Sequence, residues 1–211
     1  MRKITALHAG TGKRNRVNIS LDDRFAFSLE AEVVAKEGLQ VGQELTTAQA
    51  ENLAKYDHYH RCFNAASHYL SYRPRSESEL RERLQRRGFD GDCIEVVLAK
   101  LKRQDLVDDV AFARFWKDNR ESFSPRSQRL TKLELRRKGI VSEVIEQVVA
   151  TIDDGESAYR VAVSRARHLP SSDYRIFFRR LGGYLKRRGF DYGVINHTVE
   201  RVWQERVDSS G

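Results

Sequence analysis

The 211-residue sequence has little of what marks secreted, membrane-spanning or fibrous proteins. Its two cysteines, Cys62 and Cys93, are too few for a disulfide framework, so free thiols in a reducing cytoplasm are expected. No apolar run approaches the roughly 20 residues that a membrane-spanning helix needs. The first twenty residues have scattered basic side chains and no apolar core, so neither a secretory signal nor a membrane partner is expected. Only three prolines interrupt the chain, which leaves room for long helices.

Positive charge is in excess and unevenly spread. The chain carries 38 Lys and Arg against 30 Asp and Glu, a net charge of +8. A basic protein favours an acidic partner, either a nucleic acid or an acidic protein surface. Residues 156–211 hold 11 basic and 6 acidic side chains, whereas residues 106–155 hold 9 of each. Because the excess lies mostly at the C-terminal end, the sequence does not describe a uniformly basic DNA clamp.

The sequence repeats itself about every fifty residues. Gly88, Gly139 and Gly189 each follow a run of basic residues, with a leucine four positions before the glycine. Apolar residues recur 6, 10 and 13 positions after each glycine, a spacing that predicts one stripe of a helix. These residues are Ile94, Leu98 and Leu101; Ile145, Val149 and Ile152; and Ile195, Val199 and Val202. Pro-Arg-Ser also recurs, at 74–76 and at 125–127.

Each repeat is predicted to contain three helices. In the first, a helix over about 54–71 ends before Pro74, and Ser76 caps a second helix with Glu79 completing a capping box. Gly88 suits the left-handed position that ends that helix, and a third helix follows. The third repeat lacks Pro-Arg-Ser, and a break at 170–173 is expected to lengthen its second helix.

The fold class that follows is mostly α. Residues 54–105, 106–155 and 156–211 are predicted to form an elongated, curved array of three tandem three-helix repeats. Residues 1–53 are predicted to form a small N-terminal β-rich extension. It is expected to contain three strands, a short helix over 30–37 and a turn over 38–44; the strands are expected at 2–7, 16–21 and 24–29.

Catalytic and metal-binding patterns are weak in this sequence. No histidine lies at a spacing that pairs a nucleophile with a base, so neither an enzyme nor a cofactor is expected. Gly10-Thr11-Gly12-Lys13 is shorter than a phosphate-binding loop and is interpreted as a hairpin turn. On a helix His58 and Cys62 share a face, but His60 does not, so no metal site is predicted.

The basic residues before each glycine admit two interpretations. They can complement the negative end of the helix dipole and cover the core, which accounts for about one cation at each terminus. Two or three cations exceed that need and, repeated three times, can form a basic face that suits a polymeric partner. The aromatic residues lie mostly at core spacing, and Tyr72 and Tyr192 are the better candidates for exposed contacts.

The first repeat resembles the signature of a known regulatory family. The segment 69–80, YLSYRPRSESEL, with Leu84 and Gly88, resembles the first repeat of the RecX regulatory proteins. LVDD at 106–109, with Phe112-Ala113, Arg120, Glu134-Leu135 and Lys138-Gly139-Ile140, is similar to the second repeat. The resemblance is strong over about 60–150 and weaker over 151–205.

The resemblance implies a partner and a role. RecX proteins bind the RecA recombinase filament in its helical groove and inhibit its ATPase, coprotease and strand-exchange activities in recombinational DNA repair and the SOS response. It therefore implies a cytoplasmic, monomeric, non-enzymatic inhibitor that contacts RecA and also single- or double-stranded DNA through its basic face. The alternative is a direct DNA-binding protein with tandem helix-turn-helix-like units. The candidate partner-binding residues are Arg73, Arg75, Arg81, Arg86, Arg87, Arg126, Arg129, Arg136, Arg137, Lys138, Arg179, Arg180, Lys186, Arg187 and Arg188.

Overall fold

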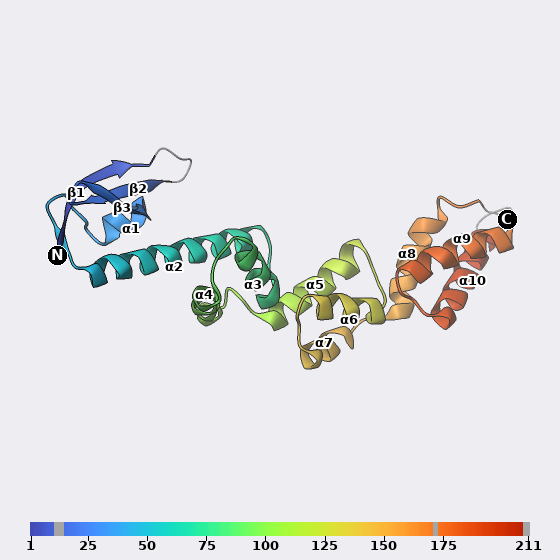
Figure 1. Cartoon of the computed structure of the whole chain (residues 1–211). Coiled ribbons are helices and arrows are strands. Elements are labelled where there is room, and N and C mark those ends of the chain that lie inside the picture. Colours follow the sequence, from blue (N-terminus) through green and yellow to red (C-terminus); the bar gives the residue numbers. More distant parts are fainter. Residues whose placement is uncertain (11–14, 171–172, 209–211) are drawn as a thin grey trace. The chain divides into compact units, whose positions relative to one another are not determined.

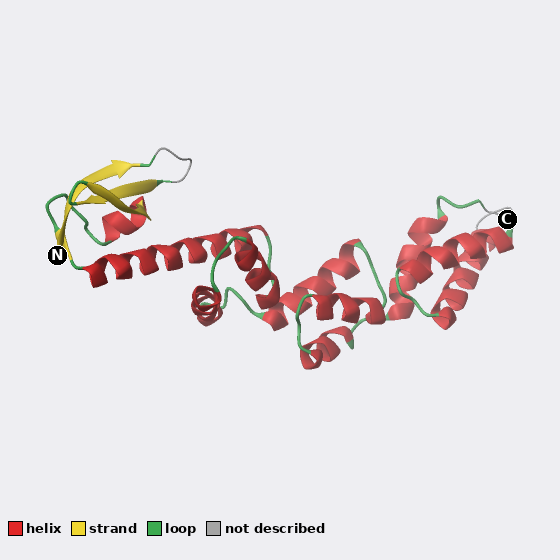
Figure 2. Cartoon of the chain, viewed as in Figure 1, coloured by secondary structure: helices red, strands yellow, loops and turns green. Residues whose placement is uncertain are grey.

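The computed structural model describes residues 1–10, 15–170 and 173–208 (Figure 1). The chain forms two compact units. The first unit comprises Met1–Arg73 with Leu80–Leu106, and the second comprises Pro74–Glu79 with Val107–Gly211. Strands lie only at the N-terminal end of the described chain, and the other elements are helices (Figure 2). The predicted mostly helical fold with an N-terminal β-rich part is confirmed. None of the described helices is long and apolar enough to cross a membrane.

An antiparallel sheet of four strands, in the order β3-β2-β1-β4, forms the N-terminal part of the first unit. The strands are β1 (Arg2–Ala9), β2 (Arg16–Leu21), β3 (Arg24–Glu30) and β4 (Glu44–Leu45). Three of them were expected, but β4 begins inside the predicted turn over 38–44, so the three-stranded prediction was wrong. Ile4 explains the difference, because its N–H donates to the Gln43 carbonyl and its own carbonyl accepts from Gly42 N–H, each at 2.8 Å. The predicted hairpin turn falls largely on residues 11–14, outside the described residues.

Two helices cover and anchor this sheet, α1 (Ala31–Lys36) and α2 (Thr47–Tyr72). The α2 helix begins at Thr47, not near residue 54, because Thr46 and Gln49 form a capping box at its N-terminus. The buried Asp57 carboxylate on α2 pairs with Arg16 at 3.2 Å and accepts the Glu30 N–H at 2.6 Å. One carboxylate therefore ties β2 and β3 to α2.

The remaining helices follow the predicted order of three per repeat. After α2, the first repeat has α3 (Glu77–Arg86) and α4 (Gly91–Arg103). The second has α5 (Asp109–Phe123), α6 (Gln128–Arg137) and α7 (Ser142–Val149). The third has α8 (Asp154–Ala166), α9 (Tyr174–Arg187) and α10 (Tyr192–Asp208). As expected, the second helix of the third repeat is longer, 14 residues in α9 against 10 in α6.

The three repeated glycines end α3, α6 and α9 as the sequence predicts. Their φ angles are +87° at Gly88, +78° at Gly139 and +91° at Gly189, in the left-handed region that favours glycine. The nine residues of the predicted apolar stripes are all buried, with at most 6% of each exposed. In the second unit these stripes and the helices around them form two apolar clusters, one over α5–α7 and one over α8–α10. In each repeat, the second helix therefore ends at a glycine, where the chain turns and leads into the third helix.

Candidate partner-binding surface

The last cation before the glycine has a structural role in the second repeat. The ammonium group of Lys138 pairs with the Glu79 carboxylate and lies 4.9 Å from the centre of the Trp116 ring. The Trp116 indole N–H donates to Glu134 at 2.8 Å, which fixes the ring beneath the ammonium group. Lys138 is therefore partly buried and held by a carboxylate and an aromatic face.

The corresponding cation of the third repeat is used in the same way. One guanidinium nitrogen of Arg188 donates to the Ser124 hydroxyl and to the Pro125 carbonyl, each at 3.1 Å. The same guanidinium lies 4.7 Å from the centre of the Tyr184 ring. Arg188 is thus a packing residue, and the structural interpretation accounts for one cation of each basic run in the second unit.

The serine of each Pro-Arg-Ser segment hydrogen-bonds to the backbone just before one of these glycines. Ser76 donates to the Lys138 carbonyl at 2.7 Å and accepts the Glu79 N–H at 3.1 Å, so it caps α3 and binds a glycine corner at once. Ser127 caps α6, and its own N–H donates to the Arg188 carbonyl at 3.1 Å. In this sequence the motif occurs in the two repeats that precede another one. We conclude that each Pro-Arg-Ser segment binds the glycine corner of the following repeat within the second unit.

The residue that follows each Pro-Arg-Ser segment donates its backbone N–H to an aspartate. Glu77 N–H donates to Asp109 at 2.9 Å, and Gln128 N–H donates to Asp154 at 2.8 Å. Burial raises the pKa of Asp154 above its ordinary value, and the nearby Asp191 and Asp153 carboxylates add to this effect. Asp154 thus serves the fold as a hydrogen-bond acceptor, and burying its charged carboxylate costs desolvation energy. We assign it no role in a reactive site.

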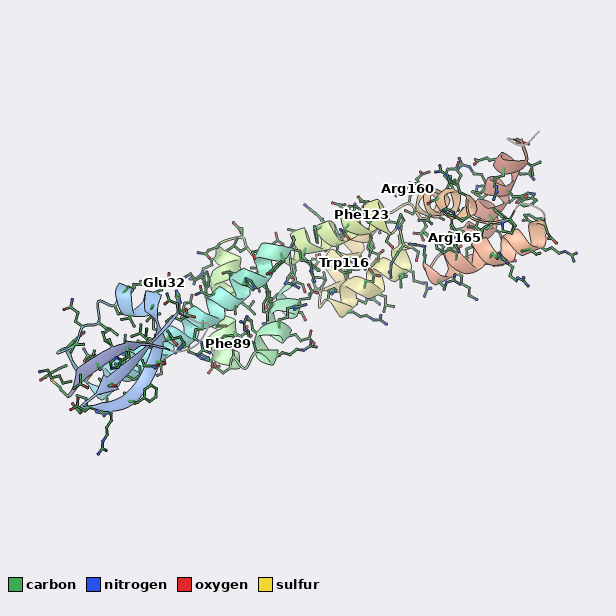
Figure 3. All side chains as sticks on the ribbon, turned by 90° about the horizontal axis from the view of Figure 1, so that it is seen from above. Glu32, Phe89, Trp116, Phe123, Arg160 and Arg165 are labelled. Atoms are coloured by element: carbon green, nitrogen blue, oxygen red, sulfur yellow. The ribbon has the colours of Figure 1, made fainter. Side chains whose placement is uncertain are left out.

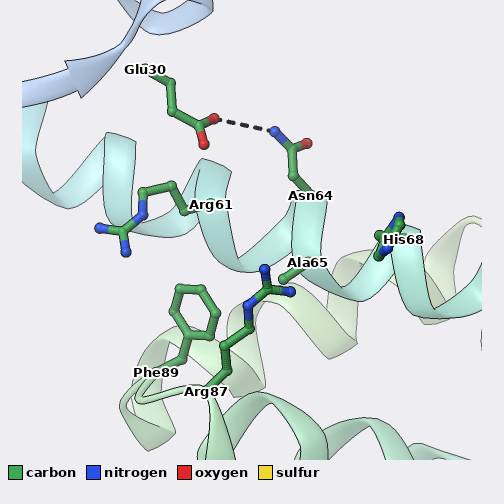
Figure 4. Close-up of a pocket in the computed structure, with 7 residues that line it drawn as sticks. All are labelled: Glu30, Arg61, Asn64, Ala65, His68, Arg87 and Phe89. Atoms are coloured by element: carbon green, nitrogen blue, oxygen red, sulfur yellow. Dashed lines mark hydrogen bonds between the residues drawn. The ribbon is translucent and has the colours of Figure 1, made fainter. Parts of the chain in front are cut away.

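Arg87, the last cation of the first repeat, has a different environment. The corner at Gly88 is open, since a Cβ added there would meet no described atom within 4 Å other than those of Gly88 and its two chain neighbours. Arg87 instead lines a hollow between α2 and the end of α3, together with Arg61 and Glu30 (Figure 4). Asn64, also at this hollow, donates to Glu30 at 3.3 Å. Two guanidinium groups against one carboxylate make this hollow suited to an anionic group.

Seven of the predicted cations are exposed and form no ion pair within residues 1–10, 15–170 and 173–208. They are Arg129, Arg136, Arg137, Arg179, Arg180, Lys186 and Arg187. Arg129 and Arg136 lie seven residues apart on one face of α6, and Arg179 and Lys186 are spaced identically on α9. Both pairs precede their glycine by the same offsets. These seven side chains are available to a partner.

The other predicted cations are less available. Arg86 pairs with Glu82 on its own helix, and Arg81 pairs with Glu95 at 2.9 Å. Arg126 pairs with Glu134, which also accepts from Arg120. Arg75 is buried and Arg73 is half-buried. The spacing of the basic residues did not signal the pairs of Arg81 and Arg126, because their carboxylates lie on other elements, whereas Glu82 lies four residues before Arg86 on the same helix.

The exposed aromatic residues include both of the predicted ones and three that were not predicted, Phe25, Phe123 and Tyr174. Tyr72 is 71% exposed and Tyr192 is 73% exposed. Phe123, at the end of α5, is 82% exposed, while Trp116 on the same helix packs inward (Figure 3). Phe123 was missed because its spacing from Trp116 is that of a core residue, but α5 ends there.

Both thiols, and the histidines considered above as metal ligands, belong to the first unit. Cys62 is fully buried, and burial raises the pKa of its thiol to about 12. Cys93 is partly exposed, and both cysteines are free. His60 pairs with Glu30 at 2.8 Å, which removes it from the set of His58 and Cys62 considered above.

Two family models match the chain. "Regulatory protein RecX N-terminal domain" matches residues 2–46, and "RecX, first three-helix domain" matches residues 62–101. The first match covers the strands and α1, and the second covers the C-terminal part of α2, all of α3 and most of α4. These are the elements that the sequence assigned to the extension and the first repeat.

Full-length relatives extend the match to the rest of the chain. The regulatory protein RecX of Clostridium botulinum (strain Eklund 17B / Type B) is 30% identical over 209 residues, 96% of this chain and 97% of the relative. That of Clostridium perfringens (strain 13 / Type A) is 28% identical over 207 residues, 96% and 97% of the two chains. A solved structure titled "Crystal structure of regulatory protein RecX" aligns with a TM-score of 0.64 at 26% identity, covering 95% of this chain and all of that one. The chain with the three glycine corners belongs to the RecX family of regulatory proteins.

Proposed function

We propose that this protein is a non-enzymatic, cytoplasmic negative regulator of the RecA recombinase. It binds the RecA filament in its helical groove as a monomer. It thereby inhibits the ATPase, coprotease and strand-exchange activities in recombinational DNA repair and the SOS response. Membership of the RecX family supports the regulatory role, and the exposed cations support an acidic, extended partner.

The observation that carries the proposal is the set of seven unpaired cations on α6 and α9. The fold does not need them, since Lys138 and Arg188 already serve the helix termini and pack against aromatic rings. Seven guanidinium and ammonium groups without carboxylate partners within the described ranges repel one another. An acidic surface, of recombinase subunits or of the phosphates they enclose, relieves that repulsion.

The test is the DNA-dependent ATPase of RecA with and without the protein. We expect the unmodified protein to inhibit ATP turnover. The triple variant Arg129→Glu, Arg136→Glu, Arg137→Glu should raise the half-inhibiting concentration at least about tenfold, a loss of about 1.4 kcal/mol of binding. Circular dichroism should report unchanged helicity, because these side chains are exposed.

A matched control separates position from net charge. Arg24, Arg103 and Arg167 are also exposed, and replacing all three with Glu changes the charge by the same amount. That control should inhibit like the unmodified protein. Equal losses in both triple variants would reduce the effect to net charge, and RecA turnover unchanged by the unmodified protein would refute the proposal.

Direct binding to DNA is the second candidate, and the same unpaired cations favour it. A protein that neutralises Z phosphates loses affinity with a log–log salt slope of about −0.7Z on single strands to −0.9Z on duplex DNA. If the protein binds naked DNA tightly with such a slope and gains nothing from RecA, the second candidate is correct. Weak binding to naked DNA together with RecA-dependent capture supports the first.

A further inference from the structure

Three metal-ligating side chains from two helices converge in the first unit. His58 projects from α2, Asp90 caps the N-terminus of α4, and Cys93 lies in the first turn of α4. One ligand atom from each lies within 4.8 Å of the other two. His58 Nε2 and Asp90 Oδ2 are 2.7 Å apart. Among the residues that the structure describes, this is the cluster with a nitrogen, an oxygen and a sulfur donor together.

The donor set and its dimensions suit zinc. Zinc binds imidazole nitrogen and carboxylate oxygen at about 2.0–2.2 Å and thiolate sulfur at about 2.3 Å, so tetrahedral ligand atoms lie roughly 3.3–3.6 Å apart. An ion between His58 and Asp90 therefore requires their 2.7 Å contact to open by less than about 1 Å. Both side chains are partly exposed and can rotate that far. A carboxylate and a thiolate together balance the charge of a divalent cation.

The neighbouring groups orient these donors. Asp90 Oδ1 accepts the Cys93 N–H at 2.8 Å, which leaves Oδ2 directed at His58. The His58 ring also packs edge-on against the buried Phe89, with ring centres 5.4 Å apart. Such outer contacts are what holds metal ligands in position. Cys62 is fully buried, so Cys93 is the thiol that an ion from solvent can reach.

We propose that His58, Asp90 and Cys93 bind a divalent zinc ion that joins α2 to α4. The fourth position faces a hollow that Lys55, Tyr59 and Val96 also line, which leaves room for a water ligand. The sequence predicted no metal site because it offered only His58, His60 and Cys62 on one helix. Asp90 and Cys93 follow in sequence by about thirty residues, and only the packing of α4 on α2 brings them to His58.

The experiment uses the full chain, reduced and freed of metal with a chelator. It is titrated with Co²⁺ as a spectroscopic probe and then with Zn²⁺ in competition. We expect one equivalent of Co²⁺, a sulfur-to-cobalt charge-transfer band, and displacement by Zn²⁺. Cys93→Ser should abolish that band, and His58→Ala should weaken Zn²⁺ binding at least about tenfold.

Two control variants define the site. Cys62→Ser should keep the charge-transfer band, since its sulfur is not a ligand. His197→Ala removes an exposed histidine on α10 and should leave Zn²⁺ affinity unchanged. His58 is partly exposed, so His58→Gln provides a foldable variant if Cys93→Ser loses helicity, and it should show the same loss of Zn²⁺ affinity.

Several results would overturn the proposal. Co²⁺ binding without a sulfur band, or equal Zn²⁺ affinity in His58→Gln and the unmodified chain, would indicate an adventitious ion only. A charge-transfer band that disappears in Cys62→Ser and persists in Cys93→Ser would show that the sulfur ligand is Cys62 and not Cys93. Inhibition of RecA is a separate readout, so failure of this proposal leaves the proposed function standing.

Discussion

Gly189 and Gly88 provide a matched pair of positions for testing the junction formed by the Pro-Arg-Ser segments. Their φ angles are +91° and +87°, and a phenylalanine follows each of them. A Cβ added at Gly189 would lie 2.5 Å from Ser127 Oγ and 2.7 Å from the Leu130 Cβ. A Cβ added at Gly88 meets no described atom within 4 Å. The two alanine substitutions therefore share the backbone cost and differ in the steric one.

The expected magnitudes follow from these two costs. An alanine in the left-handed region costs roughly 1–2 kcal/mol, which is all that Gly88→Ala should lose. Overpacking against Ser127 and Leu130 adds about 1–3 kcal/mol to the cost of Gly189→Ala. The free energy of unfolding should therefore fall by about 2–5 kcal/mol in Gly189→Ala. Gly139→Ala should resemble it, since its Cβ would overlap the side chain of Ser78.

Urea denaturation measures both effects. Far-UV circular dichroism follows all helices, and tryptophan fluorescence reports only the second unit, where both tryptophans, Trp116 and Trp203, lie. Gly189→Ala should shift the fluorescence transition to lower urea without changing its slope. If Gly189→Ala costs no more than Gly88→Ala, Ser127 and Leu130 do not press on that corner, and the proposed junction is wrong.

Two further predictions concern stability. Leu84→Ala and Leu135→Ala should each lower the free energy of unfolding by about 2–5 kcal/mol, because both side chains are fully buried in front of their glycines; unaltered thermal stability in either variant would contradict the assignment of the inner faces. Burial raises the folded-state pKa of Asp154 above 3.8, so the folded chain holds that proton more tightly than the unfolded chain and loses stability as pH rises through this range. Asp154→Asn has no such proton, and its unfolding free energy relative to the unmodified protein should increase from pH 3 to pH 7; a pH-independent difference in urea titrations would refute the cause given for the shift.

The repeats were predictable because they leave a local signal. Each glycine corner follows a helix with leucine at a fixed distance and precedes a 4–3 apolar spacing, and all three corners have positive φ. The β4 strand was not predictable, since two residues cannot show alternation. The early start of α2 depends on the Thr46 and Gln49 capping box, and the apolar periodicity used to place the helix becomes clear only further along it.

The candidate surface was only partly predictable from the sequence. Counting cations identified the exposed side chains of α6 and α9, but it could not separate them from Lys138 and Arg188. That separation depends on Glu79 and Ser124, which are 59 and 64 residues away in sequence. Residue type and local spacing carry no information about such distant partners. The convergence of His58 with Asp90 and Cys93 was hidden for the same reason.

The assignment of Pro74–Glu79 to the second unit matters for the design of fragments and chimaeras. These six residues belong to the second unit although 27 residues of the first unit, Leu80–Leu106, follow them. A fragment that starts at Val107 would leave Lys138 without Glu79 and its own corner without the Ser76 hydroxyl. No single cleavage point therefore yields two intact pieces, and chimaeras with other members of the family should exchange Pro74–Glu79 together with everything after Leu106.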